Sequence, residues 1–388
     1  MTKKRIGILT GGGDVPPLNA VISSVMQEAV NNNIELIGFL KGWDGILNKN
    51  YTYLNQKKID AEIGGTILKS SRINIAKVDN GPSKVLSNLN ELNVSGLVVI
   101  GGEDTLSNSF YIKNFPQVLI SKTIDNDVGI IRENPKGSFD IVNYFTLGYP
   151  SAAEHISKIV SLSDGLRTTA YSHERIIIVE SMGMHAGWLA LSSSIGRPDF
   201  IIIPEYAVDY NLLKDKIAER YLKEKNVIVV IAEGARWING NYISADEKDK
   251  DNFGHPKFKG AAEILSKMLK KDLEKYFDTR NVNSVNPSYL YRSGRPNALD
   301  LKAAKMLGKE AVNLFMAGLD KCVFEIVQFN APELYVDTYD LNLLNNIDEF
   351  HRFVINKFYD PIKFDVTEEG LGYLSKVVPA IKDLSISF

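Results

Sequence analysis

Two acidic turns that follow apolar runs contain the residues best suited to chemistry. In the first, SKTIDNDV, Asp125 and Asp127 stand two residues apart. Carboxylates in a pocket can accept a proton from a hydroxyl group or hold a metal ion, and Lys122 brings a positive charge for a phosphate. The same residues could instead form an Asx-turn with solvated charges, so the turn alone leaves two interpretations.

The second acidic turn is VVIGGEDTL, in which Glu103 and Asp104 follow two glycines. A Gly-Gly pair at the end of a strand permits a sharp turn whose backbone N–H groups can bind an anion. Two carboxylates are an unexpected lining for such a site.

Two further loops could bind phosphate. The turn GGGD at residues 11–14 precedes an amphipathic stretch from Leu18, but its spacing matches neither the dinucleotide-binding fingerprint nor the Walker A motif. The loop IGGTILKSSR contains Arg72, whose guanidinium could hold a phosphoryl group during transfer. An isolated arginine is usually a surface residue, so neither loop decides the function.

The elements that must position these turns are those of an α/β protein. Runs rich in Ile and Val predict buried parallel strands because nearly every position is apolar. These runs are residues 5–10, 34–40, 96–101, 118–121, 175–180, 200–204 and 227–232. Amphipathic stretches at 18–31, 152–162 and 210–225 predict crossover helices. In open parallel sheets ligands bind at the carboxyl ends of the strands, where the turns fall.

Composition narrows the class of protein. The chain has 388 residues, 44% of them hydrophobic, which is enough for two domains or one large unit. A net charge of −2 excludes bulk attraction to nucleic acid or to an anionic membrane. The single cysteine, Cys322, excludes an internal disulfide and a multi-cysteine metal site. The polar stretch 244–259 predicts a surface loop.

The sequence predicts neither a zinc site nor a membrane-spanning helix. The five histidines show no zinc-ligand spacing, so we interpret all of them as structural. The N-terminus has no signal-peptide pattern, and no stretch approaches the roughly 20 apolar residues of a membrane helix. We therefore expect a soluble, cytoplasmic protein.

The motifs occur in an order that resembles the 6-phosphofructokinases over about residues 4–310. They are GGGDVPPLN, GGTILKSSR, GGEDT, KTIDND, MGMHAG, AEGA and PSYLYRSGRPNALD. The resemblance implies phosphoryl transfer to the 1-hydroxyl of fructose 6-phosphate, with Mg²⁺ as cofactor. It also implies a homodimer or homotetramer of chains with two Rossmann-like parallel-sheet domains and the active site in the cleft between them. Residues 1–136, completed by about 296–345, would bind the donor, and residues 137–295, completed by about 346–388, the sugar phosphate.

The resemblance also implies roles for single residues. Asp125 corresponds to the general base, Asp127 to its neighbour that assists the metal or orients the base, and Glu103 to a Mg²⁺ ligand. The donor would be bound by Gly13, Asp104, Thr105 and Lys122, with Arg72 on the phosphoryl group in transfer. The sugar phosphate would be bound by Thr123, Asp125, Arg175, Met182, Gly183, Met184, Glu233, Tyr289 and Arg292.

Two positions predict the phosphoryl donor. In the family, ATP users have glycine where this chain has Asp104 and Lys122, and pyrophosphate users have Asp and Lys. Asp104 would repel the α-phosphate of ATP, because like charges at about 4 Å repel by about 1 to 4 kcal/mol. Lys122 would add a positive charge beside the shorter donor. We therefore expect pyrophosphate to be the donor and the reaction to be near reversible.

Several departures from the family leave alternatives open. Met184 and Asn283 stand where arginines are common, and Pro17 stands where glycine is common. The alternatives are an ATP-dependent enzyme, an enzyme for another sugar phosphate such as sedoheptulose 7-phosphate, or a non-catalytic sugar-phosphate-binding subunit. Retention of Asp125, Glu103 and Lys122 favours an enzyme.

Overall fold

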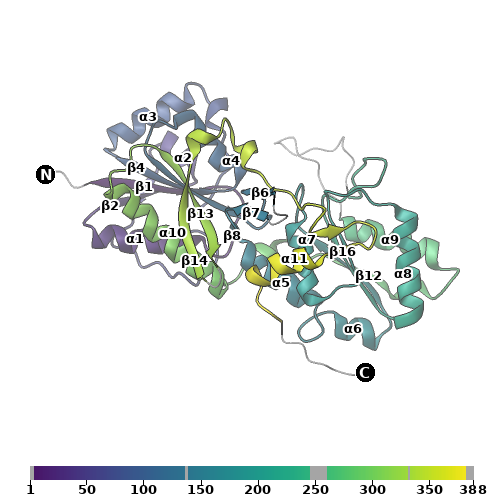
Figure 1. Ribbon diagram of the computed structural model, residues 1–388. Coiled ribbons are helices and arrows are strands. Elements are labelled where there is room, and N and C mark those ends of the chain that lie inside the picture. Colours follow the sequence, from purple (N-terminus) through teal and green to yellow (C-terminus); the bar gives the residue numbers. More distant parts are fainter. Residues whose placement is uncertain (1–3, 136–138, 245–259, 331–332, 382–388) are drawn as a thin grey trace. The chain divides into compact units, whose positions relative to one another are not determined.

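The computed structural model describes residues 4–135, 139–244, 260–330 and 333–381 and divides the chain into two compact units (Figure 1). The first unit is Met1–Ser151 with Arg292–Arg352, and the second is Ala152–Tyr291 with Phe353–Phe388. The loop expected at 244–259 lies outside the described residues, apart from Ser244.

The first unit is built on an eight-stranded sheet. Its strands are β1 (Arg5–Thr10), β2 (Glu35–Phe39), β3 (Tyr51–Tyr53), β4 (Gly96–Gly101), β5 (Gln117–Thr123), β8 (Leu147–Gly148), β13 (Cys322–Asn330) and β14 (Glu333–Asp340). The order is β14-β13-β5-β4-β1-β2-β3, and β8 pairs with β5. The central pairs are parallel, whereas β3 and β14 are antiparallel to their neighbours at the edges.

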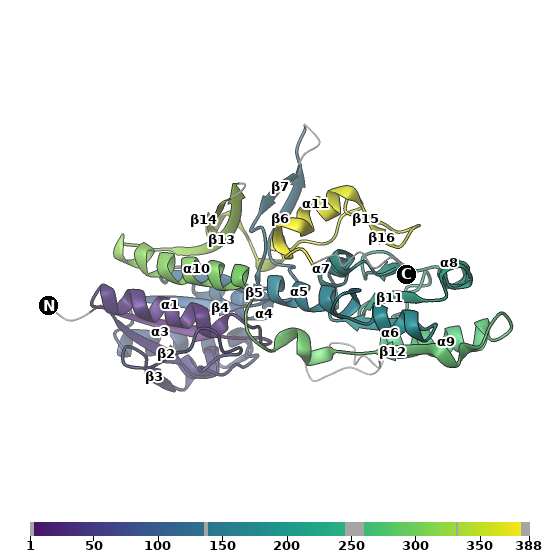
Figure 2. The same cartoon turned by 90° about the horizontal axis from the view of Figure 1, so that it is seen from below.

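Helices cover both faces of this sheet. They are α1 (Leu18–Asn31), α2 (Trp43–Leu47), α3 (Gly81–Glu91), α4 (Glu103–Leu106) and α10 (Ala298–Met316). A Cβ atom at Gly96 would meet Phe315 of α10, whereas the next residue, Leu97, packs in the cluster that contains Val85 and Leu89 of α3. Because successive side chains of a strand point to opposite faces, α10 and α3 cover opposite faces. Figures 1 and 2 both show α1 beside α10.

The second unit contains a four-stranded parallel sheet of order β10-β11-β9-β12. The strands are β9 (Ile176–Ser181), β10 (Phe200–Ile202), β11 (Val227–Ala232) and β12 (Val282–Val285). Its helices are α6 (Arg167–Ser172), α7 (Trp188–Ser192), α8 (Tyr210–Glu224), α9 (Ala261–Leu273) and α11 (Glu368–Val377), and α5 (Tyr149–Val160) runs into it from the first unit. Short antiparallel pairs complete the structure: β6 (Ile130–Glu133) with β7 (Phe139–Val142), and β15 (Tyr359–Asp360) with β16 (Asp365–Val366).

The first boundary between the units differs from the expected residue 136. The strand β8 pairs with β5 of the first unit. Asp300 at the start of α10 is fully buried and accepts hydrogen bonds from the backbone N–H groups of Gly148 at 2.9 Å and Ser151 at 3.0 Å. These contacts keep the chain in the first unit up to Ser151, and the later crossings fall after Tyr291 and Arg352.

The expected fold class is confirmed. Each predicted strand run contains an observed strand, and the three predicted helices correspond to α1, α5 and α8. The edge strands β3 and β14 were not predicted, because they lack the continuous apolar run of a buried parallel strand. Cys322 is buried at the start of β13. Within the described ranges, no helix combines the length and the apolar character needed to cross a membrane.

Candidate active site

The turn after β5 presents the two aspartates in the first unit. The backbone N–H of Asp125 donates to Oγ1 of Thr123 at 3.0 Å, and Asn126 has a left-handed backbone with a φ of 56°. This conformation reverses the chain so that Asp125 and Asp127 flank Asn126. Burial, together with the negative charge of Glu103, raises the pKa of Asp127. The predicted acidic turn is therefore a partly desolvated group of carboxylates.

Glu103 and Asp127 lie on either side of a histidine. Nδ1 of His351 is 3.6 Å from Oε2 of Glu103, and its Nε2 is 3.9 Å from Oδ2 of Asp127. Each of the three residues offers a ligand atom within 4.8 Å of the other two. Burial raises the pKa of Glu103, and the nearby negative charges of Asp104 and Asp348 act in the same direction.

This cluster fits a divalent cation. Oδ1 of Asp127 is buried and has no hydrogen-bond partner within the described part of the chain, as expected of an atom whose partner is an ion. Carboxylate oxygens suit Mg²⁺, and an imidazole nitrogen also suits transition metals. His351 belongs to this candidate cluster, which the interpretation of all five histidines as structural did not anticipate. The sequence could not indicate this role, because His351 lies far along the chain from both carboxylates.

Lys122 lies at the end of β5, beside the first glycine turn. Its side chain is almost fully buried, and Nζ donates a hydrogen bond to the carbonyl oxygen of Gly13. Burial lowers the pKa of Lys122 to about 7, and the positive charges of Arg292 and Arg72 contribute to the shift. The site thus holds several cationic groups close enough to repel one another, an arrangement that a polyanion would stabilise.

In the first glycine turn, cationic side chains lie so close to the backbone that a residue with a Cβ atom would be crowded. A Cβ atom at Gly13 would lie 2.6 Å from Nη1 of Arg292, and one at Gly12 would lie 3.2 Å from Nζ of Lys122. Arg72 is exposed and follows Ser71, whose carbonyl oxygen accepts a hydrogen bond from Gly12 at 3.4 Å. The structure therefore brings Gly13, Lys122 and Arg292 together, with the loop of Arg72 beside them.

The GGED turn opens into the short helix α4. The backbone N–H groups of Thr105 and Leu106 donate to the carbonyl oxygen of Gly102, each at 3.0 Å. Thr105 is buried, and its carbonyl oxygen accepts a hydrogen bond from Nε1 of Trp43 at 2.9 Å. Asp104 is exposed, in contrast to Thr105. Glu103 and Asp104 thus have different surroundings, with only Glu103 beside Asp127 and His351.

In the second unit, the loop after β9 is joined to the end of β11. Oε1 of Glu233 accepts a hydrogen bond from the N–H of Gly183 at 3.3 Å, and the N–H of Gly234 donates to the carbonyl oxygen of Gly183 at 3.2 Å. A Cβ atom at Gly234 would lie 1.9 Å from the carbonyl oxygen of Met184. The predicted residues Met182, Gly183, Met184 and Glu233 therefore form one group.

One predicted sugar-phosphate residue, Arg175, lies apart from this group. Arg175 precedes β9, whereas Met182 follows it, so a strand rising about 3.3 Å per residue separates them by roughly 20 Å. Nη1 of Arg175 donates to Oγ1 of Thr169 at 2.6 Å. Tyr289 is 76% exposed. Within one chain, the structure does not bring Arg175 to the Met182 loop.

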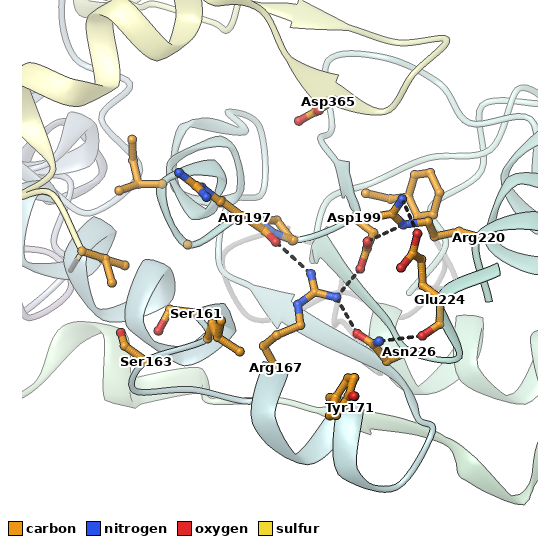
Figure 3. Close-up of a pocket in the computed structure, with 16 residues that line it drawn as sticks. Ser161, Ser163, Arg167, Tyr171, Arg197, Asp199, Arg220, Glu224, Asn226 and Asp365 are labelled. Carbon is orange, nitrogen blue, oxygen red and sulfur yellow. Dashed lines mark hydrogen bonds and ion pairs between the residues drawn. The ribbon is translucent and has the colours of Figure 1, made fainter. Parts of the chain in front are cut away.

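The second unit also contains a cavity of about 810 Å³ (Figure 3). Arg167 and Arg220 both contact Asp199 there, with N–O distances of 2.6 and 2.9 Å. Arg167 also donates to the carbonyl oxygen of Arg197 at 2.8 Å. Among the described residues that line this cavity, none is a predicted site residue, so it is separate from the candidate site.

Comparison with known proteins identifies the family. The model of the phosphofructokinase family, described as Phosphofructokinase, matches residues 5–315, and the chain belongs to this family. It is 38% identical to a pyrophosphate--fructose 6-phosphate 1-phosphotransferase of Dictyoglomus thermophilum over 324 residues, 82% of this chain and 88% of the relative. It is 36% identical to ATP-dependent 6-phosphofructokinase 3 of Streptomyces coelicolor over 321 residues, 81% and 88% of the two chains.

Solved structures share the fold. The crystal structure of a pyrophosphate-dependent phosphofructokinase from Nitrosospira multiformis superposes with a TM-score of 0.80 at 20% identity, covering 96% of this chain and 91% of that one. The chain is therefore a phosphofructokinase-family enzyme, and relatives named for either donor are similar to it to nearly the same degree.

Proposed function

We propose that this chain transfers a phosphoryl group from inorganic pyrophosphate to the 1-hydroxyl of fructose 6-phosphate, reversibly and with Mg²⁺. The observation that supports the donor most strongly is the buried ammonium of Lys122 on the glycine turn, with Arg292 close enough to lower its pKa. A small donor with a high density of negative charge complements such a cluster. Such a donor would also keep Lys122 protonated, because a nearby anion favours the charged form of lysine.

The proposed reaction uses Asp125 as the general base. Its carboxylate accepts the proton of the 1-hydroxyl while that oxygen attacks the phosphorus, and the bond to the leaving phosphate breaks. Lys122 and Arg72 stabilise the negative charge that develops on the transferring and leaving groups. Thr123 and the group Met182, Gly183, Met184 and Glu233 orient the sugar.

Glu103 and Asp127 are the residues that would hold Mg²⁺, with His351 beside them. The bound ion would neutralise the phosphate oxygens. Asp104 is exposed and outside this cluster, which agrees with a separate task. We propose that its negative charge disfavours the longer nucleotide donor, as like charges would repel there.

Arg175 and Arg292 were both expected to bind the 6-phosphate. The guanidinium of Arg292 lies at Gly13, on the donor turn, so we propose that it also acts on the phosphoryl groups. Arg175 is too far from Met182 in one chain, and it can serve the sugar phosphate only from a second copy. This supports the proposal of a homodimer or homotetramer. We further propose that the enzyme is cytoplasmic, that its first unit binds the donor, and that its second unit binds the sugar phosphate.

The donor is tested by assaying fructose 6-phosphate phosphorylation with pyrophosphate and with ATP, in both directions. Robust activity with ATP and none with pyrophosphate would refute the proposed donor. The paired variant Asp104→Gly with Lys122→Gly is expected to lose pyrophosphate activity. Asp44→Gly is the matched control, because Asp44 is also an acidic residue in the first turn of a short helix. Full pyrophosphate activity in the paired variant would contradict the roles of both residues.

An ATP-dependent enzyme is the second candidate, supported by the 36% identity to the ATP-dependent relative. Assays with sedoheptulose 7-phosphate in place of fructose 6-phosphate separate the sugar specificities. Binding of fructose 6-phosphate without turnover by any donor would favour a non-catalytic subunit.

A further inference from the structure

The acidic turn is held in place by a buried arginine that the sequence motifs did not single out. Arg352 is 2% exposed. Its Nε donates to the carbonyl oxygen of Asn126 at 2.7 Å, its Nη2 donates to Oδ1 of the same residue, and its backbone N–H donates to the carbonyl oxygen of Asp127 at 2.8 Å. One residue therefore contacts the turn through its side chain and its backbone.

The same guanidinium also contacts the stretch before β8. Nη1 of Arg352 donates to the carbonyl oxygen of Asn143 and to that of Tyr144, the latter at 3.2 Å. The N–H of Thr146 donates to Oδ1 of Asn126 at 3.1 Å. Arginine has five donors in a planar fork and can satisfy several carbonyl oxygens at once, whereas lysine acts from a single nitrogen.

Asn143 anchors this arrangement to the sheet. Its Nδ2 donates to the carbonyl oxygen of Val128 at 2.7 Å and to Oγ of Ser121 at 2.9 Å. Its Oδ1 accepts the N–H of Val327 in β13 at 3.1 Å. The turn is thus tied through Asn143 to the strand that carries Lys122 and to its neighbour β13.

The residues before Arg352 lie along the same turn. His351 forms an antiparallel bridge with Val128, and the N–H of Gly129 donates to the carbonyl oxygen of Phe350 at 3.0 Å. This pairing places His351 at Glu103 and Asp127. We call residues 350–354 the strap.

The end of the strap belongs to the second unit. There the N–H of Val354 donates to Oε1 of Glu205 at 2.8 Å, and the same oxygen accepts the N–H of Gly187 at 2.9 Å. Gly187 ends the loop that begins at Met182 and leads into α7. Burial raises the pKa of Glu205 to about 7. The carboxyl group of Glu205 therefore ties the strap to the predicted sugar loop.

On the basis of the proposed function, we propose that Arg352 is a positioning residue for Asp125 and Asp127. We also propose that Glu205, which binds the end of the strap, positions the end of the Met182–Gly187 loop. Neither residue is assigned a contact with substrate. The bonds of Arg352 fix the backbone on both sides of the aspartates, while the bonds of Glu205 fix the end of the sugar loop. Each is expected to act on a different kinetic constant.

The first test uses Arg352→Lys, which keeps the charge and loses the fork. We expect kcat to fall at least about tenfold, because small misplacements of reacting groups are costly, while KM for fructose 6-phosphate stays within about threefold. Asn126→Gly tests the same hydrogen bonds between Arg352 and the acidic turn if Arg352→Lys does not fold. Glycine tolerates the positive φ, so the variant loses only the side-chain amide of Asn126. It should lower kcat in the same direction. Arg5→Lys is the matched control, since Arg5 also donates to a backbone carbonyl oxygen in the first unit.

The second test uses Glu205→Leu and Glu205→Gln. Leucine removes the acceptor and should raise KM for fructose 6-phosphate several-fold, whereas glutamine keeps an acceptor oxygen and should restore a KM close to that of the unmodified protein. If the strap links the two positions, the losses of Arg352→Lys and Glu205→Leu in kcat/KM should not multiply in the double variant. Losses that multiply would refute the link.

An independent readout separates this proposal from the proposed function. Amide hydrogen exchange at residues 123–128 should be faster in Arg352→Lys and Asn126→Gly than in Arg5→Lys. An unmodified protein that turns over no donor would refute the proposed function. The exchange result would still test whether Arg352 holds the acidic turn in place. Unchanged exchange at 123–128, or an Arg352→Lys variant with unchanged kcat, would overturn the positioning role of Arg352.

Discussion

Replacing Lys122 with methionine is expected to stabilise the first unit and to remove activity with pyrophosphate. Burial and nearby arginines lower the pKa of Lys122 from 10.5 to about 7. At 1.36 kcal/mol per pKa unit, holding the ammonium charged in the folded protein costs roughly 5 kcal/mol. The hydrogen bond to Gly13 offsets about 1 to 3 kcal/mol of this cost. The methionine variant should therefore gain roughly 2 to 4 kcal/mol of stability at pH 7.

The pH dependence gives a sharper test than the stability at one pH. Because the folded-state pKa of Lys122 lies below its unfolded value, the unfolded chain binds more protons between about pH 7 and 10.5. The stability of the lysine protein therefore rises with pH in this window, relative to the variant, with a limiting slope of about 1.4 kcal/mol per pH unit. The advantage of methionine should shrink accordingly. Below about pH 7 it should approach a constant value, because lysine is protonated in both states.

Urea unfolding followed by tryptophan fluorescence can measure this difference. Trp43 lies in the first unit and donates to the carbonyl oxygen of Thr105 at 2.9 Å, so it reports on the candidate site itself. Both proteins should carry Trp188→Phe and Trp237→Phe, whose effects on the second unit then cancel in the comparison. A stability difference that does not change from pH 6 to pH 9.5 would refute the reasoning, as would a methionine variant that is less stable throughout. Its kcat/KM with pyrophosphate should fall roughly 10²- to 10³-fold.

Three further changes test separate parts of the molecule. Asp125→Asn should lower kcat by roughly 10²- to 10⁴-fold with little change in fructose 6-phosphate affinity measured by calorimetry, because it removes the proposed base; an unchanged kcat would exclude that role. Gly13→Ala would place a Cβ atom 2.6 Å from Nη1 of Arg292, so KM for pyrophosphate should rise, and an unchanged KM would remove Arg292 from the donor site. Glu325 is buried, and neither carboxyl oxygen has a hydrogen-bond partner among the described residues. Burial raises its pKa well above the usual value, so its carboxyl group destabilises the folded protein increasingly as the pH rises above about 4.5. Glu325→Met should therefore unfold at higher urea than the unmodified protein at pH 8, with a smaller gain at pH 5; a loss of stability at pH 8 would contradict this.

The sequence alone determined most of the parallel strands, several crossover helices and the loops that carry the chemistry. Buried parallel strands leave a continuous apolar run such as that of β4, and the turns at their carboxyl ends carry the acidic residues and glycines. Because these signals are local, Asp125, Glu103 and the glycine turn could be recognised before the structure was known. The order of the motifs also indicated the family to which the chain belongs.

Only the tertiary structure decided which of these residues meet. Arg352 contacts Asn126 across 226 residues of sequence, and no local pattern marks either residue as a partner of the other. The place of His351 between Glu103 and Asp127, and of Arg292 at Gly13, depends equally on distant segments that return to the sheet. The lowered pKa of Lys122 also follows from burial and from neighbours that only the folded chain assembles. Residue types fix the available chemistry, whereas strand order and long-range packing fix the distances and the desolvation that make it work.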